Sequence, residues 1–132
     1  MSFLEMENGR IFYEAKGEGR WLVLVHGAWA SSGWWRWQIP QLSRTYRLLT
    51  FDLRGHGQSS PLLKPDSVEG FAKDLEILSR EVGVTEAALV GWSLGGMISL
   101  QYALSHPSEV KALVLVGTRR NRDPQMKRKI LF

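Results

Sequence analysis

The sequence of 132 residues contains no cysteine, which excludes disulfide bonds, thiolate zinc sites and a cysteine nucleophile. It also lacks long apolar runs: the longest, Trp21–Val25 and Ala112–Val116, are far too short to span a bilayer. The N-terminus carries early acidic residues and no apolar run behind a basic segment, unlike a signal peptide. We therefore expect a cytoplasmic protein without a membrane span.

Positive charge is concentrated at the end of the chain. Six of the 17 basic residues fall in the last 14 positions, which leaves 11 basic and 12 acidic residues before them. A basic tail can bind nucleic acid or anionic lipid, but a solvated segment explains the same charges, and we expect neither partner. The length fits one domain, with residues 1–118 as its core and 119–132 as a basic segment leading to a cap or C-terminal part.

The apolar pattern predicts six strands. Two short alternating runs, Phe3–Glu7 and Ile11–Ala15, are separated by Asn8-Gly9, a pair that favours a tight hairpin turn. Further runs that are continuously apolar are typical of strands covered by helices on both faces of a mostly parallel sheet. These runs span Trp21–Val25, Arg47–Asp52, Ala87–Gly91 and Ala112–Val116.

Three segments between these strands have helical character, at roughly Gly33–Ser43, Val68–Val82 and Ser93–Ser105. In the second, apolar residues recur every three or four positions and form one apolar face. A hairpin followed by alternating strands and helices indicates the α/β class. We expect a mostly parallel sheet with an N-terminal antiparallel hairpin and helices on both faces.

Gly91-Trp92-Ser93-Leu94-Gly95 matches the pattern G-x-S-x-G between a predicted strand and a predicted helix. A serine in such a sharp turn adopts a strained backbone, so the positions two before and two after it must be small. Gly91 and Gly95 meet this requirement. The pattern predicts Ser93 as a nucleophile, whereas the simpler interpretation is a plain strand-to-helix turn.

His26-Gly27-Ala28-Trp29 follows the strongest strand, where a second donor of an oxyanion hole is expected. Gly27 would let the loop turn toward the serine. The backbone N–H groups of Ala28 and Leu94 would then converge on one carbonyl oxygen. We expect the His26 ring to hold this loop through hydrogen bonds rather than to act as the base.

A charged loop, FDLRGHGQSS at residues 51–60, leaves another predicted strand. Together with HGAW, VGWSLGG and KALVLVGT, this loop resembles the first part of the α/β-hydrolase superfamily, in its esterase, lipase and C–C hydrolase branch. The resemblance covers nearly the whole chain to Thr118 and implies a fold truncated after about six strands. It further implies that Asp52, Arg54 and His56 brace their loop, and that no metal or organic cofactor takes part.

The resemblance also implies a chain order of serine, acid and histidine, with the last two on later loops that this chain does not contain. His106, at the end of the third predicted helix, is interpreted as a capping residue. Trp29, Trp34 and Trp92 are candidates for lining a substrate pocket. Helix-to-sheet packing explains the tryptophans that follow the oxyanion loop equally well.

The leading hypothesis is a serine hydrolase acting on small ester-like or related carbonyl substrates. The serine at position 93 disfavours the aspartate nucleophile of similar dehalogenases, but it permits perhydrolase or haloperoxidase-like chemistry. Two alternatives remain: a catalytically inactive fragment, and a ligand-binding receptor on the same fold. We also expect self-association through an exposed sheet edge beside Ala112–Val116.

Overall fold

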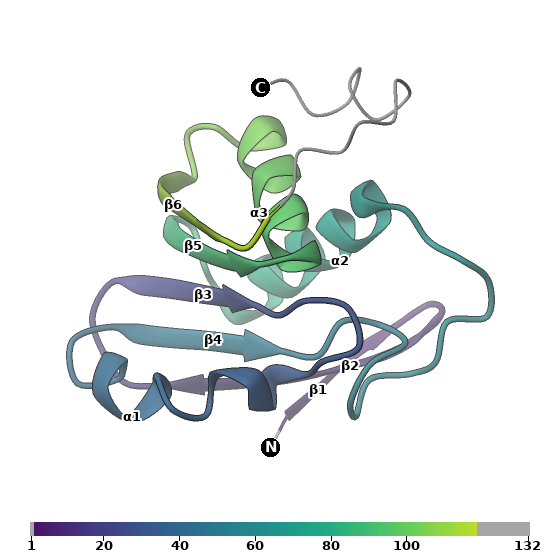
Figure 1. Cartoon of the computed structure of the whole chain (residues 1–132), viewed down its shortest axis with the longest axis horizontal. Coiled ribbons are helices and arrows are strands. Elements are labelled where there is room, and N and C mark those ends of the chain that lie inside the picture. Colours follow the sequence, from purple (N-terminus) through teal and green to yellow (C-terminus); the bar gives the residue numbers. More distant parts are fainter. Residues whose placement is uncertain (1, 119–132) are drawn as a thin grey trace.

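A computed structural model describes residues 2–118, so the predicted basic segment 119–132 lies outside the described residues. Six strands of this part form a single sheet (Figure 1). They are β1 (Ser2–Met6), β2 (Gly9–Lys16), β3 (Trp21–Val25), β4 (Arg47–Phe51), β5 (Ala87–Trp92) and β6 (Val110–Val116). Their order across the sheet is β1-β2-β4-β3-β5-β6.

The sheet is mostly parallel, as the sequence predicts. β4, β3, β5 and β6 run parallel, whereas β2 is antiparallel to both β1 and β4. The hairpin turn differs from the prediction by one residue: Met6 pairs with Gly9, so Glu7 and Asn8 occupy the turn. Gly9 opens β2 with φ of 126°, a conformation that glycine adopts without the steric cost of a Cβ.

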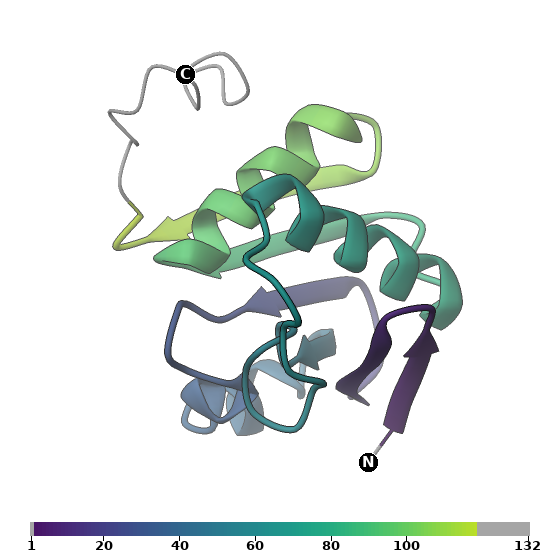
Figure 2. The same ribbon diagram turned by 90° about the vertical axis from the view of Figure 1, so that its right-hand side faces the viewer.

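Two long helices pack side by side on one face of the sheet (Figure 2). The first, α2, spans Val68–Val82 as predicted. Its N-terminus is capped by Ser67, whose hydroxyl accepts the N–H of Gly70, and it ends at Gly83 with φ of 89°. The second, α3, spans Leu94–Ser105 and has Ser93 as its N-cap residue.

The segment Gly33–Ser43, predicted to be helical, is not one continuous helix. The structure instead has a 3₁₀ turn, η1 (Ser32–Trp35), and one short helical turn, α1 (Ile39–Leu42). Pro40 has no N–H and cannot donate to the carbonyl of Arg36, so a continuous helix through this segment would lose a hydrogen bond. The proline lies in the first turn of α1, where a missing N–H costs nothing.

The core lies on both faces of the sheet. On one face, buried residues of β3 and β4 such as Val23 and Leu49 pack against Leu75 and Leu78 of α2. On the other face, a smaller cluster is formed with Trp35 of η1. Its remaining buried members are Leu22, Leu24 and Leu48. No helix of the described residues is long and apolar enough to cross a membrane.

The connections reverse direction at β3. The chain leaves β3 through η1 and α1 to reach β4 on one side, and returns through α2 to reach β5 on the other. In open α/β sheets, ligands bind outside the carboxyl ends of the strands at such a switch point. The loops after β3 and β5 are therefore the place to look for a site.

Candidate functional site

Ser93 occupies a strained turn between β5 and α3. Its φ of 54° and ψ of −116° fall in a region that side chains other than glycine rarely adopt. The surrounding backbone fixes it: its N–H donates to the carbonyl of Val116 at 2.9 Å, and its carbonyl accepts the N–H of Gly96 at 3.0 Å. Its hydroxyl has no hydrogen-bond partner among residues 2–118 and makes no capping bond to α3.

Two glycines allow the chain to approach itself closely at this turn. A Cβ at Gly91 would overlap the carbonyl oxygen of Gly95, and a Cβ at Gly95 would overlap the carbonyl oxygen of Val25. The first contact is between β5 and α3, and the second is between α3 and β3. The glycines of the G-x-S-x-G pattern thus permit the start of α3 to pack against the ends of two strands.

Thr118 supports the same turn, a contact that the sequence pattern did not predict. Its Oγ1 donates to the carbonyl oxygen of Ser93 at 3.2 Å. A Cβ at Gly96 would overlap this hydroxyl oxygen. The signal in the sequence is a hydroxyl residue two positions after the last predicted apolar strand, but the pairing depends on the sheet bringing β6 beside β5.

The predicted oxyanion residues lie on neighbouring loops. Val25 at the end of β3 is in register with Gly91 of β5, so the two loops leave the same edge of the sheet side by side. Only two non-glycine residues of the described chain have positive φ: Ser93, and Trp29 at 62°. Backbone strain of this kind is found preferentially at functional sites.

The N–H groups of Ala28 and Leu94 donate to no acceptor among residues 2–118. Ala28 is exposed, and Leu94 opens α3 in the first turn of the helix, where N–H groups have no intrahelical partner. These two donors flank the two strained residues directly in sequence. Both are thus free to receive an acceptor from outside the described chain.

His26 is fully buried beneath the first of these loops. Its Nδ1 lies 2.7 Å from the carbonyl oxygen of Gly27, and its Nε2 accepts the N–H of Leu53 at 3.0 Å. A carbonyl can only accept, so Nδ1 carries the proton and the ring is neutral. The ring therefore joins the loop after β3 to the loop after β4.

Burial lowers the pKa of His26 below its ordinary value. The hydrogen bond to Gly27 raises this pKa and nearby His56 lowers it, but burial has the largest effect. In the unfolded chain this imidazole titrates near 6.5, so the unfolded state binds the additional proton. We expect the free energy of unfolding to fall as pH drops below about 6.5 toward the folded-state pKa.

Urea unfolding of the wild type and His26→Gln at several pH values tests this expectation. Near pH 8 the variant should be less stable by about 2 kcal/mol, because two buried hydrogen bonds are disturbed. The difference in stability should narrow below about pH 6.5. Only the wild type has His26, and it loses stability there because its unfolded state takes up a proton on this imidazole. A difference that stays constant with pH would show that His26 does not titrate as described.

Side-chain contacts hold the charged loop after β4 in place. Asp52 and Arg54 make these contacts with other residues and not with each other. Buried Asp52 accepts the N–H of Ser32 at 2.7 Å through Oδ1 and that of Gln58 at 2.9 Å through Oδ2. Arg54 pairs instead with Asp66 and with the nearly buried Asp74 of α2. Asp52 thereby fastens the loop that follows the candidate oxyanion residues.

Asp74 was not singled out by sequence reasoning, although the sequence contains a signal for it. It lies three residues after Phe71 and four before Leu78, so it falls on the apolar face of α2. A carboxylate in that position requires a partner, because burying an unpaired charge is costly. Arg54 supplies the partner, at 2.5 Å from Nε to Oδ2.

The structure brings together two of the three candidate pocket tryptophans. The rings of Trp34 and Trp92 stack with centroids 3.7 Å apart and planes 8° apart. A Cβ at Gly27 would lie 2.8 Å from the Trp92 ring, so the loop after β3 also packs on that ring. Trp29 is 97% exposed and makes no ring contact with any residue from 2 to 118, whereas Trp35 is a core residue.

None of the described histidines is engaged with the serine. The Nδ1 of His56 lies 3.1 Å from the carbonyl oxygen of Arg54. His106 ends α3 as its C-cap, stacks on Tyr102 and has its Nε2 3.4 Å from a Glu76 oxygen. Residues 2–118 also hold no cluster of three side chains suited to a metal ion. A base for Ser93 would have to come from outside the described residues.

Comparison with known proteins adds a family to this geometry. A family model described as the α/β-hydrolase fold matches residues 20–130. A pimeloyl-acyl-carrier-protein methyl ester esterase of Aliivibrio salmonicida is 36% identical over 108 residues, which is 82% of this chain and 40% of the esterase. The chain thus spans less than half the length of this curated relative.

Solved structures give the same result. A hydrolase from Pseudomonas aeruginosa superposes with a TM-score of 0.88 at 30% identity, covering 96% of this chain and 49% of the hydrolase. An N-acyl homoserine lactonase complexed with N-butanoyl homoserine superposes with a TM-score of 0.82 at 33% identity, covering 89% of this chain and 44% of the lactonase. The predicted fold class is confirmed by these similarities.

Proposed function

Because the chain belongs to the α/β-hydrolase family, we propose that it supplies the nucleophile and oxyanion hole of a serine hydrolase for small ester-like or related carbonyl substrates. In this proposal Ser93 attacks the carbonyl carbon. The N–H groups of Ala28 and Leu94 stabilise the negative charge that develops on the carbonyl oxygen. A histidine outside the described residues takes the serine proton.

One observation carries the proposal: the strained backbone of Ser93 at the junction of β5 and α3. Such a conformation costs about 1–3 kcal/mol and persists only where the surrounding structure enforces it. Here the enforcing contacts are the bonds to Val116, Gly96 and Thr118, together with the close packing of Gly91 and Gly95. This turn places the serine at the carboxyl end of the sheet, at the switch point of the fold.

Roles for the flanking residues follow from the contacts described above. His26 and Gly27 support the loop that carries Ala28, and the stacked Trp34 and Trp92 provide an aromatic wall next to Ser93. Aromatic rings offer large apolar area at a pocket wall. We propose that this pair contacts the substrate, whereas Trp29 is exposed and does not join the wall.

A fluorophosphonate probe tests the proposal on the 132-residue chain. Labelling is measured by peptide mapping with and without added imidazole, which substitutes for the absent base. We expect labelling of Ser93 at least about 100-fold faster than of the exposed Ser108, because oxyanion donors alone contribute about that much. Ser93→Ala should abolish the label while leaving the circular dichroism spectrum unchanged.

The outcome separates the proposed function from its alternatives. A Ser93 that reacts no faster than Ser108, even with imidazole, would contradict the hydrolase and favour an inactive fragment or a ligand-binding receptor. Neither alternative needs a reactive serine. Labelling that survives in Ser93→Ala would place the nucleophile elsewhere.

A further inference from the structure

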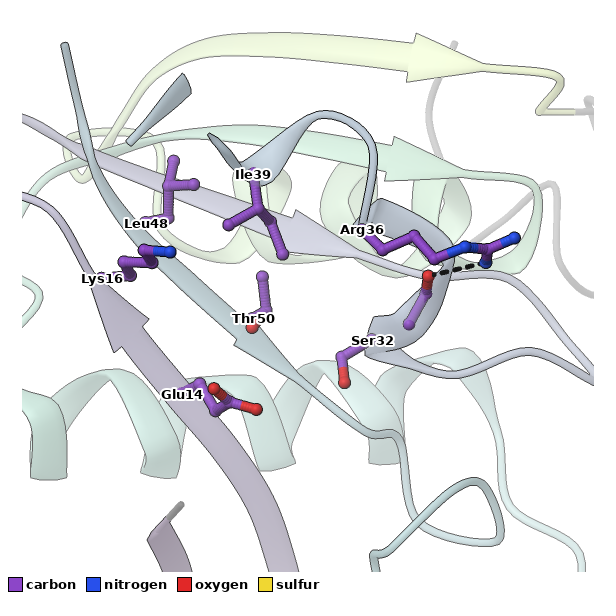
Figure 3. Close-up of a pocket in the computed structure, with 8 residues that line it drawn as sticks. Glu14, Lys16, Ser32, Arg36, Ile39, Leu48 and Thr50 are labelled. Carbon is purple, nitrogen blue, oxygen red and sulfur yellow. Dashed lines mark hydrogen bonds between the residues drawn. The ribbon is translucent and has the colours of Figure 1, made fainter. Parts of the chain in front are cut away.

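A cavity of about 230 Å³ lies above β2 and β4, on the face of the sheet that η1 and α1 cover (Figure 3). Its floor is built from two directly opposed pairs on antiparallel strands: Glu14 with Thr50, and Lys16 with Leu48. Opposed residues point to the same side of a sheet, so these four side chains form one surface. The wall comes from residues of η1 and α1 and the turn between them, namely Ser32, Gly33, Arg36 and Ile39.

The floor carries two opposite charges that do not pair. Glu14 and Lys16 are two positions apart on one strand, which places their backbones about 6.5–7 Å from each other. Neither side chain forms an ion pair or hydrogen bond with any residue from 2 to 118. In Figure 3 the ammonium of Lys16 and the carboxylate of Glu14 lie apart along the sheet. Both charges are thus available to a ligand.

The rest of the cavity combines hydroxyl groups with an apolar surface. Thr50 and Ser32 contribute hydroxyls, and the backbone of Ser32 is fixed by its bond to the carboxylate of Asp52. Leu48 and Ile39 contribute the apolar part. The guanidinium of Arg36 donates to the carbonyl of Gly33 at 3.1 Å and is thereby held at the rim.

We propose that this cavity binds a free α-amino acid with an aliphatic side chain. The ligand ammonium would donate to Glu14, its carboxylate would accept from Lys16, and its side chain would cover Leu48 and Ile39. In this arrangement each charged group of the ligand would make one charge-assisted hydrogen bond of about 2.8 Å to its partner side chain.

Charge and size select this class of ligand. A simple anion would face the carboxylate of Glu14, and a simple amine would face Lys16 and Arg36, so each single charge meets repulsion in the cavity. The volume is below the roughly 300–1,000 Å³ of pockets that hold drug-sized ligands, which favours a compact molecule. The lining includes neither Ser93 nor the Trp34–Trp92 pair, so the site is independent of the proposed hydrolase chemistry.

Calorimetric titration of the 132-residue chain with L-leucine tests the proposal. We expect saturable binding that weakens at least about tenfold in Glu14→Gln and in Lys16→Met, since each variant removes one charged contact. The matched control is Lys64→Met, an exposed lysine outside this cavity that should leave binding unchanged. Isocaproate and isoamylamine, which keep the aliphatic chain with one charge each, should bind at least about tenfold more weakly than leucine.

Several results would overturn the assignment. The first is that leucine shows no saturable binding to the wild type. The second is that the wild type binds isocaproate as tightly as leucine. The third is that Glu14→Gln and Lys16→Met both bind leucine as tightly as the wild type does. Glu14 and Lys16 are exposed, so their replacement should leave the melting temperature nearly unchanged, and thermal melts verify that the variants are folded. Because the readout is binding, it does not depend on whether Ser93 reacts.

Discussion

Gly95→Ala is expected to yield little or no folded protein. Gly95 lies in the first turn of α3, with a helical backbone that alanine would ordinarily favour. However, a Cβ at this position would overlap the carbonyl oxygens of Val25 and His26. Those atoms belong to the last residue of β3 and the residue after it, so relief requires moving α3 away from the sheet. We expect a loss of at least about 3 kcal/mol in the free energy of unfolding, a large part of the stability of a domain this size.

Gly83→Ala is the matched control for this prediction. Gly83 has φ of 89°, which is strained for alanine, but a Cβ there would meet nothing within 4 Å. It should cost only about 1 kcal/mol, because the strain is local and nothing must move. Urea unfolding and soluble yield compare the two variants. Equal stability of Gly95→Ala and Gly83→Ala would contradict the close packing of α3 on β3.

Sequence patterns predicted those strands and helices whose formation depends on their own residues alone. The apolar run Trp21–Val25 and the three- and four-residue spacing over Val68–Val82 both match the structure at both ends. Each pattern depends only on which face its own residues bury. The segment Gly33–Ser43 forms two short helical turns and not one helix, because Pro40 interrupts the hydrogen-bond ladder, a local signal that outweighs the helical composition around it.

The contacts of the candidate site divide in the same way. The glycines around Ser93 could be predicted, because the strained turn imposes their small size within five residues of sequence. The stack of Trp34 on Trp92 could not, since it joins segments separated by one strand and two helices. The cavity at Glu14 and Lys16 was also missed, because it exists only where β2 lies beside β4.

The strand β6 leaves an apolar edge of the sheet exposed. It lies at the edge of the sheet and pairs with β5 alone among the described strands. Val114, Leu115 and Val116 are 49%, 38% and 45% exposed. An apolar edge strand presents unpaired N–H and C=O groups to another chain. We propose that the 132-residue chain therefore pairs through β6 with a second copy of itself.

Light scattering coupled to size exclusion should find the 132-residue chain at twice the monomer mass or more. Val114→Lys should shift it to the monomer, because a charge on an edge strand opposes pairing with a neighbouring strand. Leu63→Lys is the control, since Leu63 is 89% exposed but lies away from the sheet edge, and it should leave the mass unchanged. A wild type that is monomeric at all concentrations would contradict the proposal, as would an oligomer that Leu63→Lys dissociates and Val114→Lys does not. Pairing through β6 specifically requires that only the edge substitution acts, because a general apolar attraction would respond to both.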